Sequence, residues 1–157
     1  MTELQADTLR GAAGGALATV PMTGVMGLFH YALPEEREPV PPEQVTENTA
    51  RKLDIADDLP GGWRTPVSLA AHFGYGAAAG GIFGPLARRS RLPAIAIGMV
   101  YGLGVWAFSY LGYLPALGLR REPKHDPPAR TLMMVAAHLV WGASLGLAFR
   151  ALGGRSS

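Results

Sequence analysis

Cysteine is absent from this 157-residue chain. Its absence excludes disulfide bonds, thiolate metal sites and cysteine nucleophiles. Charge is also scarce, since 17% of the residues are Asp, Glu, Lys or Arg while 48% are apolar. The net charge of +2 forms no basic stripe along any one segment, so we expect no nucleic-acid partner.

Four long windows of the sequence contain no charged residue at all. A helix needs about 20 such residues to cross a bilayer. The windows therefore argue against a soluble globule and predict an all-α, polytopic membrane protein whose main partner is the lipid bilayer. They cover residues 11–34, 65–87, 92–119 and 131–149.

Prolines mark the ends of these windows and define the expected organisation. Thr65 followed by Pro66 is typical of a helix cap and first turn, and Pro21 predicts a kink inside the first helix. The chain is expected to form four transmembrane helices within one domain, 11–152. The expected parts are a cytoplasmic N-terminal segment (1–10), spans at about 11–33, 66–87, 93–115 and 129–151, a long loop (35–64) and a tail (153–157).

The loops differ in length and in density of positive charge. The turn 88–91 is so short that the helices around it must be antiparallel neighbours, and it carries three arginines. By the positive-inside rule, this dense cluster predicts that both termini are cytoplasmic. Within the long loop, residues 42–53 fit a short surface helix or an irregular solvated segment equally well.

An internal repeat is the most informative feature of the sequence. Residues 70–83 align without a gap on residues 136–149 and share the pattern A-A-H-x-x-[YW]-G-A-x-x-G-x-x-F. The chain is therefore predicted to contain two helical-hairpin repeats that run in the same direction. This places His72 and His138 at equivalent positions, about 10 Å below the same membrane surface.

These intramembrane histidines are the main candidates for a functional site, because ionisable groups at that depth face the bundle interior and have a partner. Three hypotheses follow. His72 and His138 ligate a metal, above all a haem b for electron transfer; they line a polar pocket for a small hydrophobic ligand; or they donate hydrogen bonds that support assembly of the helices. The other expected pocket residues are His30, Tyr75, Ser109, Tyr110 and Trp141.

Catalytic groups are hard to find. The charge-free windows exclude a pair of membrane-embedded carboxylates, and Ser68 and Ser144 lack the surroundings that activate a serine nucleophile. We therefore expect a protein without enzymatic activity.

Glycines recur at a spacing of four residues in the predicted helices. Small residues at this spacing allow helix backbones to approach closely in lipid. Tight packing within the chain is one interpretation, and a homo-oligomer contact or room for a flat ligand are the others. The packing candidates are Gly76, Gly80, Gly98, Gly102, Gly142 and Gly146.

Three segments resemble the YagU-like family of small bacterial inner-membrane proteins. They are 71–80 (AHFGYGAAAG), 104–115 (GVWAFSYLGYLP) and 137–142 (AHLVWG). The resemblance implies a four-helix protein of the bacterial inner membrane with no assigned activity. It implies no catalytic residues.

Overall fold

The computed structural model describes residues 1–32, 41–119 and 126–154. Within these ranges all regular secondary structure is helical, which confirms the all-α class. The third predicted span is one continuous stretch of α4, η1 and α5, in which η1 is a π-helix that the sequence did not indicate. The helices are α1 (Glu3–Ala32), α2 (Pro41–Lys52), α3 (Arg64–Arg88), α4 (Ala94–Trp106), η1 (Ala107–Tyr113), α5 (Leu114–Ala116) and α6 (Pro128–Ala151).

Three helical stretches of the described chain are long and apolar enough to cross a membrane. These are α1, the continuous helix Ala94–Ala116 and α6. Helix α3 has 25 residues but is not among them. The composition of these three helices therefore indicates a membrane protein. Whether α3 also crosses the membrane depends on how it packs against the other helices.

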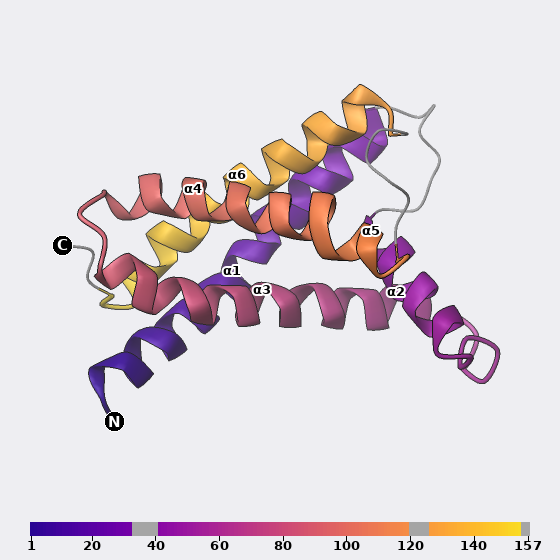
Figure 1. Cartoon of the computed structure of the whole chain (residues 1–157), viewed down its shortest axis with the longest axis horizontal. Helices are drawn as coiled ribbons and strands as arrows, with labels where there is room; N and C mark the ends of the chain where they lie inside the picture. The colour runs from indigo at the N-terminus through magenta and orange to yellow at the C-terminus, as the bar shows by residue number, and fades with distance from the viewer. Residues whose placement is uncertain (33–40, 120–125, 155–157) are drawn as a thin grey trace.

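The four long helices run between two ends of the molecule (Figure 1). Both termini and the turn between α3 and α4 lie at one end, and α2 and α5 lie at the other. Helix α1 contacts both α3 and α6, and α4 contacts α6, whereas contacts between α3 and α4 are sparse. The bundle therefore consists of two tightly crossed pairs, α1 with α3 and α4 with α6, which are joined through α1 and α6.

Glycine backbones make both tight crossings. A Cβ atom built on Gly15 would lie 2.1 Å from the carbonyl oxygen of Gly76, and one on Gly98 would lie 2.1 Å from that of Gly142. Side-chain carbons do not approach oxygens this closely, so the pairs exist because these positions have no side chain. The other glycines predicted for packing also lie at these crossings within the chain: Gly80, Gly102 and Gly146.

Helix α1 begins before the predicted span, at Glu3, so residues 3–10 belong to the first helix and not to a separate segment. Its start is a capping box: the Gln5 backbone N–H donates to Thr2 Oγ1 at 3.2 Å, and the Thr2 N–H donates to Gln5 Oε1 at 2.9 Å. This pattern satisfies two backbone donors at once. The T-x-x-Q pattern of a capping box is present at residues 2–5, but the charge-free window from which the first span was predicted begins only at residue 11.

A buried carboxylate joins the start of α1 to the end of α3. Asp7 is 2% exposed and accepts hydrogen bonds from Arg88 Nη1 at 3.0 Å and from Arg10 Nη1 at 3.1 Å. Arg88 also pairs with Glu3. The hydrogen bonds to Asp7 and then to Glu3 raise the pKa of the Arg88 guanidinium above its ordinary value, so this cation keeps its charge.

Two predictions about the long loop are decided by the structure. Residues 41–52 are helical, which settles the open choice in favour of a surface helix. The predicted cap at Thr65 is wrong, because α3 begins at Arg64 and the Thr65 hydroxyl donates to Glu43 Oε1 of α2 at 3.1 Å. Residues 35–40 of the long loop, residues 120–125 between α5 and α6, and the last residues of the tail lie outside the described residues.

Candidate functional site

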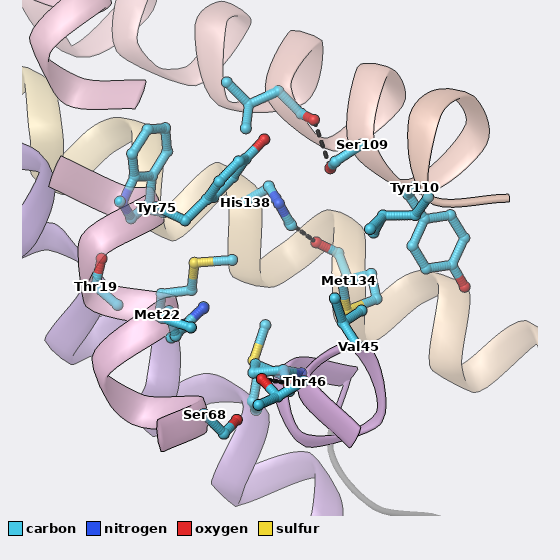
Figure 2. A pocket seen from close by; sticks show the side chains of 18 of the residues that line it. Thr19, Met22, Val45, Thr46, Ser68, Tyr75, Ser109, Tyr110, Met134 and His138 are labelled. Carbon is cyan, nitrogen blue, oxygen red and sulfur yellow. Dashed lines mark hydrogen bonds between the residues drawn. The ribbon is translucent and has the colours of Figure 1, made fainter. Parts of the chain in front are cut away.

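A cavity of about 230 Å³ lies inside the helix bundle, between α1, α2, α3, η1 and α6 (Figure 2). It lies towards the end of the molecule that carries α2 and α5. Most of its wall is apolar, and the polar atoms come from a few histidine and hydroxyl side chains. The structure brings together here most residues of the expected pocket: His72, Tyr75, Ser109, Tyr110, His138 and Trp141.

His138 is held in one orientation by its own helix. The side chain is 5% exposed, and its Nδ1 lies 2.8 Å from the carbonyl oxygen of Met134, one turn earlier (Figure 2). A carbonyl oxygen only accepts, so Nδ1 is the donor. In the neutral ring this leaves a lone pair on Nε2, which has no hydrogen bond to any residue in the described ranges.

His72 comes from α3 and contributes a second imidazole to the same cavity. Its Nε2 atom is buried and has no hydrogen-bond partner among the described residues. A buried polar atom without a partner costs free energy. The cavity wall therefore contains two imidazoles, and neither Nε2 atom has a hydrogen-bond partner among the described residues.

Tyr75 crosses the cavity from α3 towards the π-helix. It points towards Ser109 (Figure 2), and its hydroxyl lies near those of Ser109 and Tyr113. Ser109 donates its own proton to the Val105 carbonyl at 2.7 Å. Short π-helical segments occur often at functional sites, where they change the direction of side chains on an otherwise regular helix; here η1 directs Ser109 and Tyr113 to the cavity.

Tyr110 and Trp141 use their polar atoms elsewhere. Tyr110 is 1% exposed, and its hydroxyl donates to the Asp126 carboxylate, just before α6. Trp141 Nε1 donates to the Gly15 carbonyl at 3.2 Å and so ties α6 to α1. Both residues therefore supply mainly aromatic surface to the cavity.

Helix α2 closes the cavity on the side of the long loops. Pro42, Val45 and Thr46 form part of the cavity wall. Polar side chains hold α2 in place, and Glu47 of α2 also pairs with Arg64 at 3.5 Å. The hydrogen bonds include Asn48 Nδ2 to the Leu119 carbonyl at 3.0 Å, Lys52 Nζ to the Leu117 carbonyl at 2.5 Å, Thr65 Oγ1 to Glu43 Oε1 at 3.1 Å and Arg130 Nη2 to Gln44 Oε1 at 2.9 Å.

One expected pocket residue is placed elsewhere. His30 is exposed in the last turn of α1 and does not line the cavity. It lies one turn beyond the buried Met26, where α1 has already passed the cavity. Ser68 and Met134 do line it. Ser68 could have been found, because it lies one turn before His72 on the same helix face; Met134 carries no comparable signal in the sequence.

The cavity does not fit a haem b. Apolar cavities of about 150 Å³ hold a single aromatic ring in other proteins, and a porphyrin, which joins four rings, needs more room than about 230 Å³. For the haem hypothesis the sequence offers Arg120, Arg121 and Arg130 as partners of the propionates. Arg130 donates to Gln44, and the other two lie outside the described residues. The described chain also contains no group of three or more His, Asp or Glu side chains that could hold a metal ion.

The arrangement suits reversible binding of a small neutral molecule. Two imidazoles and several hydroxyl groups offer hydrogen bonds in an apolar wall, and none of the described residues that line the cavity is an acid or a permanently charged base. Comparisons with protein-family models, with curated proteins and with solved structures find no match to this chain.

Proposed function

We propose that this chain is a four-span protein of the bacterial inner membrane that binds a small hydrogen-bonding molecule through His72 and His138. Helix α3 is the fourth span in this proposal, although its composition is less apolar. The support is its position: it extends between the same two ends as the three apolar helices (Figure 1) and crosses α1 through glycine contacts. The proposal agrees with what the resemblance to the YagU-like family implies.

The geometry of the crossings also supports a duplicated hairpin. Gly76 and Gly142 each follow a cavity histidine by four residues, and each is the contact point of its own crossing, with Gly15 and with Gly98. Equivalent residues therefore make equivalent contacts in the two helix pairs. A duplication explains this agreement because both copies would inherit the same small residue at the same contact.

The position of α3 can be tested by cysteine labelling, since the native chain has no cysteine. Asp57→Cys lies before α3, and Ser90→Cys lies in the turn after it. If α3 spans the membrane, a membrane-impermeant maleimide will label Asp57→Cys in intact cells and will label Ser90→Cys only after permeabilisation. Labelling of both from the same side would show that α3 does not cross, and the reversed pattern would overturn the cytoplasmic assignment of the termini.

One observation carries the binding proposal: His72 and His138 line a single apolar cavity, and neither Nε2 atom has a hydrogen-bond partner among the described residues. Because Met134 fixes His138 as a donor at Nδ1, its neutral Nε2 accepts. The preferred ligand therefore donates a hydrogen bond, as a hydroxyl does and a ketone does not. A single ring fits, since apolar cavities of about 150 Å³ hold benzene in other proteins.

The test uses 4-bromophenol as the probe and protein in lipid nanodiscs. Its bromine quenches tryptophan fluorescence, and Trp141 lines the cavity. We expect saturable quenching by 4-bromophenol and only non-saturable quenching by bromobenzene, which lacks the hydroxyl. His138→Leu and His72→Leu should each weaken binding by about tenfold, because a lost hydrogen bond in an apolar site is worth about 1.4 kcal/mol.

His30→Leu is the matched control, because it removes an imidazole that lies outside the cavity. It should bind 4-bromophenol as the native protein does. If a leucine variant does not fold, His138→Gln and His72→Gln replace it. Equal quenching by 4-bromophenol and bromobenzene, or unchanged binding in both cavity variants, would contradict the binding proposal. The histidines would then serve the assembly of the helices.

A further inference from the structure

A second hollow lies beside the cavity, on the outer side of the bundle between α3 and the stretch of α4 and η1. It measures about 660 Å³, and its wall is apolar almost throughout. We call it the α3–α4 groove. Helix α3 contributes Ala78 and Ile82 to the groove, and the opposite wall includes Gly104 and Phe108. Ile82 and Phe108 are 62% and 68% exposed, so the groove opens outwards, which is towards lipid in a membrane.

The α3–α4 groove and the central cavity share part of their walls. Tyr75, Val105 and Tyr113 line both spaces, so only side chains separate them. Contacts between α3 and α4 are few. Tyr101 donates to the Ala79 carbonyl at 2.7 Å and ties α4 to α3 within the wall of the groove itself. Gly104 and Phe108 lie further from the α3–α4 turn.

The cavity wall is therefore built differently on these two sides. Towards the long loops it includes α2, which polar contacts tie to α3, to α6 and to the segment after α5. Towards the groove it consists of the side chains of Tyr75, Val105 and Tyr113, and reorientation of Tyr75, which is 41% exposed, would join the two spaces. Exposed side chains change rotamer in picoseconds to nanoseconds, whereas collective motions of helices take microseconds to milliseconds. The easier path leads from the lipid side.

We infer that the ligand is a lipid-soluble phenol or quinol with an apolar tail, which enters from the bilayer past Tyr75. Its hydroxyl donates to His138 Nε2, and its tail remains in the α3–α4 groove. This inference rests on the proposed function, because the histidine cavity provides the site for the headgroup. It adds the chemical class of the ligand and the route.

The test compares two probes in nanodiscs: 4-bromophenol, and 4-octylphenol as its competitor with a tail. Gly104→Phe fills the groove, and a Cβ atom at this position meets no atom within 4 Å, so the variant keeps its backbone. We expect Gly104→Phe to weaken displacement by 4-octylphenol about tenfold, since overfilling an occupied site costs about 1–3 kcal/mol. Binding of 4-bromophenol should be unchanged.

Gly27→Phe is the matched control. A Cβ atom there also meets nothing within 4 Å, and Gly27 lines neither the cavity nor the groove. Gly27→Phe should change neither the binding of 4-bromophenol nor its displacement by 4-octylphenol. If Gly104→Phe does not fold, Ala78→Phe fills the groove from the opposite wall.

The outcomes separate the two proposals. If 4-bromophenol binds but 4-octylphenol does not displace it, or displaces it equally from the native protein and Gly104→Phe, the lateral route is wrong and the proposed function stands. If neither probe binds, the proposed function fails and this inference fails with it.

Photo-crosslinking with a phenol that carries a diazirine at the end of its tail provides a second, independent test. Crosslinks should fall on Ile82 and Phe108 and be lost in His138→Leu; crosslinks on α2 would overturn the route.

Discussion

Gly142→Leu is expected to prevent assembly of the helix bundle. A Cβ atom on Gly142 would lie 2.1 Å from the carbonyl oxygen of Gly98 and 3.1 Å from the Cα atom of Met99. Both neighbours are backbone atoms, so no side-chain rotation relieves the clash and α6 must move away from α4. We expect a loss of more than about 4 kcal/mol in the free energy of unfolding, which few single substitutions exceed.

The measurement is the yield of monodisperse protein in mild detergent, together with its thermal unfolding temperature. Gly24→Leu is the matched control, because a Cβ atom on Gly24 meets nothing within 4 Å. It adds the same side chain to a lipid-facing position and should leave stability almost unchanged. If Gly142→Leu were as stable as Gly24→Leu, α4 and α6 would not cross at these glycines.

Asp7→Ala is expected to have the second largest effect on stability. This substitution removes a carboxylate that is 2% exposed and accepts from both Arg88 and Arg10. Hydrogen bonds to charged groups contribute about 1.5–3 kcal/mol each. The side chains of both arginines are about two-fifths exposed, so water replaces part of the lost interaction. We therefore expect the free energy of unfolding to fall by about 2 kcal/mol in total. Thermal or denaturant unfolding in detergent measures this change.

Glu3→Gln provides the control for Asp7→Ala. Glu3 also pairs with Arg88, but its side chain is 77% exposed, and exposed ion pairs contribute about 0–1 kcal/mol. The effect of Glu3→Gln should therefore be small and should shrink further at high salt. Equal losses for Glu3→Gln and Asp7→Ala would contradict the buried position of Asp7.

The glycine crossings also explain why a cavity and a groove exist. They pull α1 onto α3 and α4 onto α6 until backbone atoms touch. No such contact draws α3 to α4, and the few contacts between them leave the α3–α4 groove. Substitutions at the crossings are thus expected to alter ligand binding as well as stability, because the shape of the cavity depends on the same contacts.

The sequence determined the all-α class and the approximate positions of the apolar helices. A charge in lipid is costly wherever it occurs, so its absence from a window is a local property that requires no knowledge of the fold. The repeat likewise singled out His72 and His138, because it is visible in the order of residues alone. The same local reasoning placed α6 within one residue of its observed start.

Only the tertiary structure decided what surrounds those histidines. Whether a side chain faces a cavity depends on the rotation of its helix and on the neighbouring helices, which is why His30 is exposed while Ser68 lines the site. Helix α2 became part of the wall through bonds to carbonyl groups about 70 residues away in the chain. That His72 Nε2 has no partner in the part of the chain that the structure describes is also a tertiary property, because a hydrogen bond requires an acceptor or donor in space and the sequence does not record distance.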